Sequence, residues 1–422
     1  MNPAEIGARL VALVRDGDRL LVGTGAGEPR TLIRALVDHV LPQRTAVEII
    51  QVAVGGAEEL ATVGRLRGHR VRFLAAGAAG LRAVRAGEAE LFPASMNGFE
   101  RLLADGDLGI DGLLVAGSRA ADGRISPGLS FDVVATAAAV ARFRALECNS
   151  ALPVTTADRW ISEAECQLVV DSAEPVAEEP PPPPTEAQLE IGRQVAALIP
   201  DDAVVELGVG RALAGVAAAL LRRRPGSLRV HTGLLTDNVR DLVDSGVVAG
   251  DLPCAPGACV VGTAARGSAG FLAWLDGNPR VRLAPSSHAH DVGHLAGFAR
   301  YVAVNSAGRV DLLGQVGCPS GDAMFGGGGL VDYATAGAVR AGSVIAIEAR
   351  DARGRSKIVA RAGHVQLPGS AVTHVVTEYG TAVLRGATAA ERAARILRIA
   401  HPDDRETLAA EAVLAVPAGA PR

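Results

Sequence analysis

Apolar residues recur along the first half of the chain in short runs that alternate with stretches of helical spacing. Residues 4–16 carry apolar side chains three and four positions apart, which predicts an amphipathic helix. Apolar runs predict strands at 19–22, 47–54, 71–74 and 112–116, and helical spacing predicts helices at 31–40, 57–66 and 131–144. A glycine-rich turn is expected at 117–123. Such alternation is typical of a doubly wound α/β domain built on a parallel sheet.

The same alternation resumes after residue 185. Thr185 is placed to cap a helix at 186–198. Strands are then predicted at 203–207, 228–232, 258–261, 280–283, 300–304 and 344–347, and helices at 212–223, 236–245 and 270–275. A strand-rich tail at 357–367 and 372–377 precedes an arginine-rich closing helix at 388–400. The second half therefore repeats the architecture of the first.

Five consecutive prolines at 180–184 separate the two halves. Such a run cannot continue a helix or a central strand, and it stiffens into polyproline II. We therefore predict an N-terminal α/β domain over 1–177, a linker over 178–185 and a C-terminal α/β domain over 186–422. Each half opens on a helix, a strand and a Gly-x-Gly turn, which suggests a pseudo-duplicated fold with a ligand cleft between the halves.

The second Gly-x-Gly turn, Gly208 to Gly210, follows a predicted strand, as does the tripeptide His231-Thr232-Gly233. Ligands of open parallel sheets bind beyond the carboxyl ends of the strands. We therefore expect both segments at one rim of the sheet, facing the same ligand.

Composition narrows the classes of function. A net charge of −4 gives no indication that the protein binds nucleic acid or another polyanion. Five scattered cysteines, without a C-x-x-C pair or a histidine at ligand spacing, favour a reducing compartment and argue against structural zinc. No apolar run approaches the roughly 18–20 residues of a membrane helix. We expect a soluble cytoplasmic protein with no membrane partner.

An ordered series of motifs occupies the second half. It runs through Asn305-Ser-Ala-Gly-Arg-Val-Asp311-Leu-Leu-Gly314-Gln315, Gly326-Gly-Gly-Gly329-Leu-Val-Asp332-Tyr333, Val376-Thr-Glu378-Tyr-Gly380 and Ala400-His401-Pro-Asp-Asp-Arg405. The series resembles the acetyl-CoA hydrolase/transferase family of class I CoA-transferases, which includes 4-hydroxybutyrate, butyryl and succinyl-CoA:acetate CoA-transferases. The stretches 122–132 and 149–153 fit the same family less sharply, so the resemblance covers nearly the whole chain.

The resemblance implies chemistry on an acyl-CoA thioester. In the family a glutamate carboxylate attacks the thioester, and a glutamyl-CoA thioester then carries the coenzyme to a second carboxylate. Backbone amides of a glycine-rich loop stabilise the oxyanion, and by resemblance Gly329 is such a donor. Gly208, Gly210, Gly326, Gly328, Gly329 and Gln315 are expected against coenzyme A. The family also implies a homodimer and no metal.

This chain departs from the family at the nucleophile. The family reads H-T-E where this sequence reads His231-Thr232-Gly233, so the covalent intermediate cannot form at Gly233. Neither Glu206, on the preceding strand, nor Asp237, a helical turn further on, replaces it convincingly. The family asparagine that helps to hold the thioester oxygen corresponds to His290, which is a candidate general base or the product of drift in an inactive protein.

Two further assignments concern the same rim. His288, His290 and His294 could form a metal cluster, but the resemblance implies none. Glu378 lines the site in the family and stands in an otherwise apolar strand, so it could orient His290 or a water, or bond backbone amides at the domain seam.

Three functions remain open at this point. The first is non-covalent hydrolysis or acyl transfer from an acyl-CoA or carrier-bound thioester to water or a small acceptor. The second is a CoA-transferase that uses a different carboxylate as its nucleophile. The third is an inactive acyl-CoA-binding partner protein.

Overall fold

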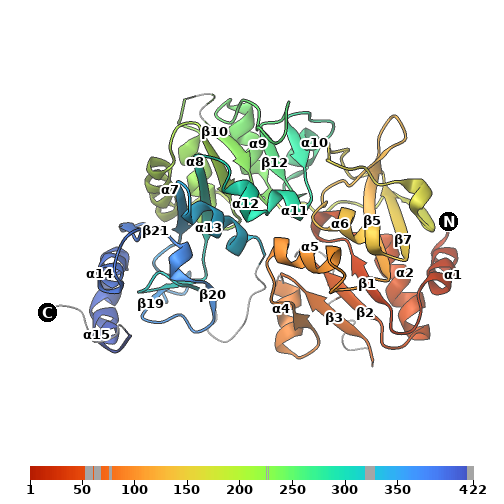
Figure 1. Ribbon diagram of the computed structural model, residues 1–422, viewed down its shortest axis with the longest axis horizontal. Helices are drawn as coiled ribbons and strands as arrows, with labels where there is room; N and C mark the ends of the chain where they lie inside the picture. Colours follow the sequence, from red (N-terminus) through yellow and green to blue (C-terminus); the bar gives the residue numbers. More distant parts are fainter. Residues whose placement is uncertain are drawn as a thin grey trace.

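Two large sheets organise the chain (Figure 1). The computed structural model describes residues 1–52, 60, 68–75, 78–224, 226, 228–318 and 328–415. The helix predicted at 57–66 falls almost wholly outside these residues, and so does Gly326.

The first sheet winds outward from a central strand in both directions. Its strand order is β4-β3-β2-β1-β5-β7-β8, with all neighbours parallel. The strands are β1 (Arg19–Val22), β2 (Glu48–Gln51), β3 (Arg70–Phe73), β4 (Glu90–Leu91), β5 (Gly112–Arg119), β7 (Phe143–Asn149) and β8 (Leu168–Ser172). A short strand, β6 (Ile125–Ser126), pairs antiparallel with β5. The chain reverses its winding between β1 and β5, which makes this the switch point of the sheet.

The second sheet repeats this plan. Its order is β14-β12-β10-β9-β15-β18-β21-β22, and only the edge strand β22 is antiparallel. The strands are β9 (Ala203–Leu207), β10 (Leu228–His231), β12 (Val260–Gly262), β14 (Val281–Leu283), β15 (Tyr301–Ser306), β18 (Gly342–Ala346), β21 (His374–Thr377) and β22 (Gly380–Val383). Here β9 takes the place of β1, with its switch point between β9 and β15. The predicted pair of doubly wound sheets is thereby confirmed.

Helices cover the sheets on both faces (Figure 1). Those of the first half are α1 (Pro3–Leu13), α2 (Arg30–Ala35), α4 (Ala78–Arg85), α5 (Met96–Ala104) and α6 (Val134–Val140). Those of the second half are α7 (Glu186–Leu198), α8 (Arg211–Leu220), α9 (Asp237–Asp244), α10 (Ala269–Leu275), α11 (Ser286–Ala289), α12 (Val292–Leu295), α13 (Leu330–Ala338), α14 (Ala389–Ile399) and α15 (Arg405–Ala415). As predicted, Thr185 caps α7, in a reciprocal capping box with Gln188.

Two expectations about the first sheet were wrong. The helix predicted at 131–144 spans only α6, because the chain from Phe143 enters β7 and pairs with both β5 and β8. The turn predicted at 117–123 begins later, because β5 continues through Gly117 to Arg119. A Cβ atom on Gly117 would lie 2.5 Å from the Ser126 carbonyl oxygen, so this glycine serves the close approach of β6.

Smaller sheets complete the second half. One pairs β11 (Leu234–Leu235) with β13 (Ala264–Ala265), and the other has the order β19-β16-β17-β20. The strands of the latter are β16 (Arg309–Asp311), β17 (Val316–Gly317), β19 (Ile358–Val359) and β20 (Val365–Leu367). In Figure 1 this four-stranded sheet lies below the second large sheet, whose edge strand β22 contacts α14.

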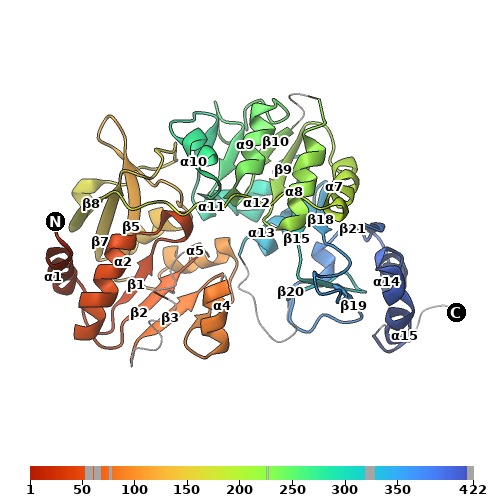
Figure 2. The ribbon, with the colours of Figure 1, turned by 180° about the vertical axis from the view of Figure 1, so that it is seen from behind.

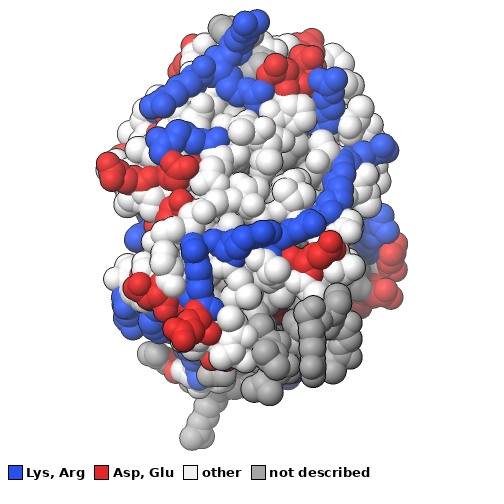
Figure 3. Space-filling model, turned by 90° about the vertical axis from the view of Figure 1, so that its left-hand side faces the viewer, with Lys and Arg blue, Asp and Glu red and all other residues white. Residues whose placement is uncertain are grey.

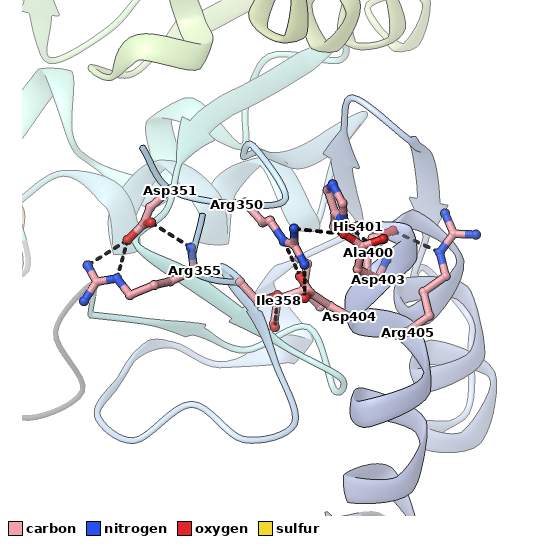
Figure 4. Close-up of polar contacts among 10 residues, drawn as sticks. Arg350, Asp351, Arg355, Ile358, Ala400, His401, Asp403, Asp404 and Arg405 are labelled. Carbon is pink, nitrogen blue, oxygen red and sulfur yellow. Dashed lines mark hydrogen bonds and ion pairs between the residues drawn. The ribbon is translucent and has the colours of Figure 1, made fainter. Parts of the chain in front are cut away.

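The motif at 400–405 joins this sheet region to the last helices (Figure 4). The Arg350 guanidinium donates to Asp404 Oδ2 at 2.9 Å and to Asp403 Oδ2 at 3.2 Å. Arg405 Nε donates to the Ala400 carbonyl oxygen at 3.0 Å across the bend between α14 and α15. This motif therefore has a structural role among the described residues.

The two halves share one hydrophobic core. A single cluster of buried side chains includes Leu21 and Val115 of the first sheet and Val205 and Val304 of the second. Backbone hydrogen bonds also cross the boundary between the two halves, which we call the seam. One of them runs from Phe131 N to the Thr263 carbonyl oxygen at 2.9 Å. The helices α5 and α11 meet there (Figure 1). The segment 173–185 has no helix or strand and runs behind both sheets from β8 to α7 (Figure 2).

The surface carries charges of both signs. Seen from the end formed by α14 and α15, bands of basic side chains alternate with acidic groups, and neither sign covers the face (Figure 3). None of the helices within the described ranges is both long enough and apolar enough to cross a membrane.

Candidate functional site

A cavity of about 510 Å³ lies where the two switch points face each other. Thr24 and Gly25 line it after β1, and Gly208 and Val209 line it after β9. The carboxyl ends of β10, β12 and β15 add further lining residues, among them Gly233. In open parallel sheets, ligands bind at the switch point, beyond the carboxyl ends of the strands. Here the switch points of both sheets border one cavity.

Gly233, His290 and Gly329 meet on one side of this cavity. A Cβ atom on Gly233 would lie 3.1 Å from His290 Cε1 and 3.2 Å from both His290 Nε2 and the Tyr333 hydroxyl oxygen. A Cβ atom on Gly329 would lie 2.6 Å from His290 Cε1 and 2.8 Å from Tyr333 Cε2. The imidazole therefore fills the direction in which a side chain at position 233 would project.

His290 is fully buried, and this burial lowers its pKa to about 3. The ring is therefore neutral at physiological pH, with one nitrogen protonated. Nε2 lies 3.2 Å from the Tyr333 hydroxyl, whereas Nδ1 lies 3.8 Å from Asp332 Oδ2, beyond hydrogen-bond distance. A Tyr333 hydroxyl that donates to Nε2 places the ring proton on Nδ1, facing Asp332.

Asp332 connects this group to the first half of the chain. It lies in the first turn of α13, and its Oδ2 accepts a bond from the Asn97 backbone N–H in α5 at 3.2 Å. Burial raises the pKa of its carboxyl group to about 6. The position of the His290 and Tyr333 pair therefore depends on the seam between the halves.

Two buried carboxyl groups that the sequence analysis did not assign also line the cavity. Glu206 accepts bonds from Asn305 Nδ2 at 2.8 Å and the Val304 N–H at 3.1 Å, and burial raises its pKa well above the ordinary range. Asp132 accepts bonds from Ser130 Oγ at 2.8 Å and Thr24 Oγ1 at 3.2 Å, and burial raises its pKa too. Glu206 did carry a signal, because it is an acidic residue within an apolar strand.

The predicted coenzyme-contacting glycines divide into groups. Gly208, Gly328 and Gly329 line the cavity. Gly210 precedes α8 with φ of +147°, and a Cβ atom there would lie 2.2 Å from Ser306 Oγ, so only glycine fits. Gly210 is outside the lining residues, and Gly326 is outside the described ones.

Glu378 and Gln315 do not line the cavity. Glu378 Oε2 accepts a bond from the Ala349 backbone N–H at 2.9 Å, so it does not orient His290. This contact corresponds to the alternative role, a bond to a backbone amide. Gln315 Nε2 donates to Asp311 Oδ2 at 2.8 Å within the four-stranded sheet.

A second cavity of about 520 Å³ adjoins the first and shares Val209 and Ser306 with it. Its lining includes three cations, Arg309, Arg355 and Lys357. Arg355 pairs with Asp351 at 2.7 Å. The sequence analysis did not group these residues, because the two arginines lie 46 positions apart in the sequence.

Solved structures place this architecture among CoA-transferase folds. RipA from Yersinia pestis is 25% identical, with a TM-score of 0.88 over 98% of this chain and 99% of that one. A 4-hydroxybutyrate CoA-transferase from Porphyromonas gingivalis shares the fold at 24% identity, with a TM-score of 0.79 over 97% of both chains. The two sheets and their shared cavity thus define a CoA-transferase-like α/β protein.

The sequence comparisons name the family. Residues 5–178 match the acetyl-CoA hydrolase/transferase N-terminal domain, and residues 267–412 match the C-terminal domain. The chain belongs to the acetyl-CoA hydrolase/transferase family. It is 29% identical to the 4-hydroxybutyrate coenzyme A transferase of Clostridium kluyveri over 95% of both chains. It is 28% identical to the succinyl-CoA:cyclohexane-1-carboxylate CoA transferase of Geobacter metallireducens, over 94% of this chain and 92% of the relative.

Proposed function

We propose that this protein acts on an acyl-CoA or carrier-bound acyl thioester without a glutamyl-enzyme intermediate, and transfers the acyl group to water or a small acceptor. The observation that carries the proposal is the His290 ring in the space beside Gly233. The family nucleophile is absent, a side chain in its place would press against His290 and Tyr333, and a group that can exchange protons stands beside it. A histidine beside the position of the missing glutamate favours altered catalytic chemistry over a simple loss of activity.

The start of α13 supplies the electrostatic part of the proposed site. Gly329 is the residue that precedes this helix, and it lines the cavity together with Leu330. The first amides of a helix lack partners within it and carry a partial positive charge. An oxyanion formed from the thioester carbonyl would be stabilised at this end, with the Gly329 amide as one donor.

His290 and Tyr333 supply the proton transfer. The oxygen of water or of a hydroxyl-bearing acceptor attacks the carbonyl carbon, and its proton passes to Nε2, directly or through the Tyr333 hydroxyl. The tetrahedral intermediate then expels the CoA thiolate as the C–S bond breaks. The thiolate takes up the transferred proton, which returns the imidazole to its neutral form.

The second cavity provides a place for the phosphates of coenzyme A. Arg309, Arg355 and Lys357 line it, and cationic side chains bind phosphate oxygens through charge-assisted hydrogen bonds. Because this cavity shares Val209 and Ser306 with the first, one extended ligand could occupy both. This continuity supports an acyl-CoA in preference to a small free acid.

The test is release of free CoA from a series of acyl-CoA esters, with and without carboxylic acid acceptors. Chromatography should quantify the CoA, because the five cysteines of the chain would consume a thiol reagent. We expect turnover by the natural chain and a loss of about 10²–10⁴-fold in His290→Ala. The exposed His364 provides the matched control, His364→Ala. A protein that binds CoA but consumes no thioester would overturn the proposal and favour an inactive binding partner.

Glu206 supports a second candidate, a CoA-transferase with a displaced nucleophile. Its carboxyl group lines the same cavity as Gly233. Its raised pKa and its bonds to Asn305 and Val304 argue against attack, because the protonated acid is a poor nucleophile. Borohydride trapping followed by peptide mapping distinguishes the two, since only the covalent route modifies Glu206.

A further inference from the structure

Three histidines and one cysteine converge beside the first cavity. They are His231, His288, His294 and Cys254, and one ligand atom from each lies within 4.8 Å of all the others. His231 ends β10, His288 lies in α11, His294 lies in α12, and Cys254 belongs to the loop between α9 and β12. Four separate segments of the chain therefore bring metal-binding atoms to one point.

His231 is the least explained member of this cluster. The side chain is completely buried, and neither ring nitrogen has a hydrogen-bond partner within the described part of the chain. Nε2 of His294 is also buried without a hydrogen-bond partner among the described residues. A buried polar group left without a partner destabilises the folded state. A bound cation would take one nitrogen of each ring as a ligand.

The arrangement of the rings suits a shared ligand. The His288 and His294 ring centroids are 4.4 Å apart, and the His231 centroid lies 5.9 and 5.5 Å from them. Bond lengths of about 2.0 Å to nitrogen and 2.3 Å to sulfur set the edges of a tetrahedral zinc site with three nitrogens and one sulfur at roughly 3.3–3.5 Å. An inward shift of about 1 Å would therefore bring the four atoms into coordination.

The surroundings of the cluster are mostly apolar. The Phe298 ring lies 5.2 Å from His294 and 5.7 Å from His231, and Leu252 and Leu295 belong to the same apolar cluster. Charged groups lie nearby as well, with Asp291 near His294 and with Asp158 and Arg282 near Cys254. The apolar part of this shell limits the access of water to the cluster. Cys254 carries a free thiol and is half-buried at the rim of this shell.

We propose that His231, Cys254, His288 and His294 form a zinc site. Three imidazoles and one thiolate match the preference of Zn²⁺ for nitrogen and sulfur ligands, and four protein ligands leave no open position. The site is therefore structural, and it takes no part in activating water. No metal was expected from the sequence, in which His290 stands close to His288 and His294, but the fold places His231 and Cys254 beside these two histidines instead.

The zinc site fixes the residues around the cavity. His231 is followed by Thr232 and Gly233, and His288 stands two positions before His290. Coordination would hold the end of β10 and α11 together. The His290 ring takes no part in coordination, because it faces Tyr333 and Asp332.

The first measurement is the metal content of the full chain, purified without a histidine tag or chelator and in the presence of a reductant. We expect one equivalent of zinc per chain by elemental analysis. Cobalt added to chelator-treated protein should give the intense ligand-field bands of tetrahedral Co²⁺ and a thiolate-to-cobalt band. Cys254→Ser should abolish the thiolate band and weaken zinc binding by at least about ten-fold, because even an outer-shell change costs that much.

Two variants separate ligation from folding. His288→Ala changes a half-buried residue and should also lose the bound zinc, whereas Cys166→Ser changes a half-buried thiol outside the cluster and should keep it. Zinc should also protect Cys254, but not Cys166, from alkylation, as read by peptide mass spectrometry. Folded natural chain that holds less than a tenth of an equivalent of zinc and gives no cobalt spectrum would overturn the proposal. A Cys254→Ser protein with unchanged affinity and spectrum would overturn it too.

Discussion

A glutamate side chain at position 233 and the imidazole of His290 compete for the same volume. The distances from a Gly233 Cβ atom to His290 and Tyr333 are 3.1–3.2 Å, so any side chain there requires its neighbours to move. The glycine and the histidine are therefore a matched pair. Restoring the family nucleophile alone would not restore its geometry.

This pairing predicts the outcome of a reversal experiment. Gly233→Glu alone should displace His290 and form no glutamyl-CoA adduct, because overpacking forces the new side chain out of position. The double variant Gly233→Glu with His290→Asn creates room and should form the adduct upon incubation with acyl-CoA. Intact-mass spectrometry reads the gain in mass. An adduct that forms equally well in the single variant would show that His290 does not occupy the critical space.

The Asp332 carboxyl group gives the molecule a predictable dependence on pH. Its pKa is raised from 3.8 to about 6 by burial, so the folded state binds this proton more tightly than the unfolded state. The free energy of unfolding should therefore fall as pH rises from about 4 through 6, by up to roughly 3 kcal/mol from this group.

Asp332→Asn tests this dependence. The amide cannot ionise, and its oxygen can still accept the bond from the Asn97 N–H. Urea unfolding at pH 4 and pH 7.5 should show the variant gaining stability relative to the natural chain at the higher pH. A difference in unfolding free energy that is the same at both pH values would contradict the raised pKa.

At the scale of elements, the contact between α7 and α8 depends on two glycines. A Cβ atom on Gly215 would lie 1.8 Å from the Gln188 carbonyl oxygen, and one on Gly192 would lie 2.0 Å from the Gly215 oxygen. The two backbones approach closely. The helix α8 lies against β15, whose carboxyl end carries Asn305 and Ser306 at the cavity, and α7 lies against β18 and β21. The close approach of the two backbones therefore requires glycine at both positions.

Gly215→Ala should therefore lower the free energy of unfolding by about 3 kcal/mol or more, at the upper end of the usual overpacking cost, because the Gln188 carbonyl group belongs to the backbone and cannot rotate away. Chemical denaturation with circular dichroism measures the change. Gly109→Ala is the matched control, since a Cβ atom there meets nothing within 4 Å. Equal stability of the two variants would show that the helices can separate without cost.

At the scale of the whole molecule, we expect the two sheets to unfold as one cooperative unit. Their buried residues form a continuous cluster, and backbone hydrogen bonds cross the seam. We expect a single transition in scanning calorimetry, with no separate unfolding of the predicted domains 1–177 and 186–422. Two resolved transitions would show that the seam contributes little to stability.

Local patterns predicted most of the fold. The strands β1, β9 and β10 and the glycines that follow them were predicted because apolar runs ending in glycine are local features. The alanine-rich stretch before Phe143 masked the start of β7, since alanine favours a helix wherever it stands. The helices α5 and α13 were missed as well, although they bring Asn97 and Asp332 together.

The site was less predictable, because its contacts are tertiary. The rim of the sheet was predicted from apolar strands that end in glycine, and His290 was proposed from the family resemblance. The Tyr333 contact, the buried Glu206 and the cations of the second cavity depend on which distant segments meet. Nothing local joins His231 to Cys254, and only the strand order brings them to one point.

The single lysine of the chain, Lys357, lines the second cavity. Amine-directed dyes can therefore attach at one internal position and at the amino terminus alone, without any engineered cysteine. A fluorophore attached at Lys357 would report the binding of a ligand in the second cavity through quenching. A ligand bound before labelling would instead shield Lys357 from the dye. The single lysine thus provides one internal site for spectroscopic labelling of the natural chain.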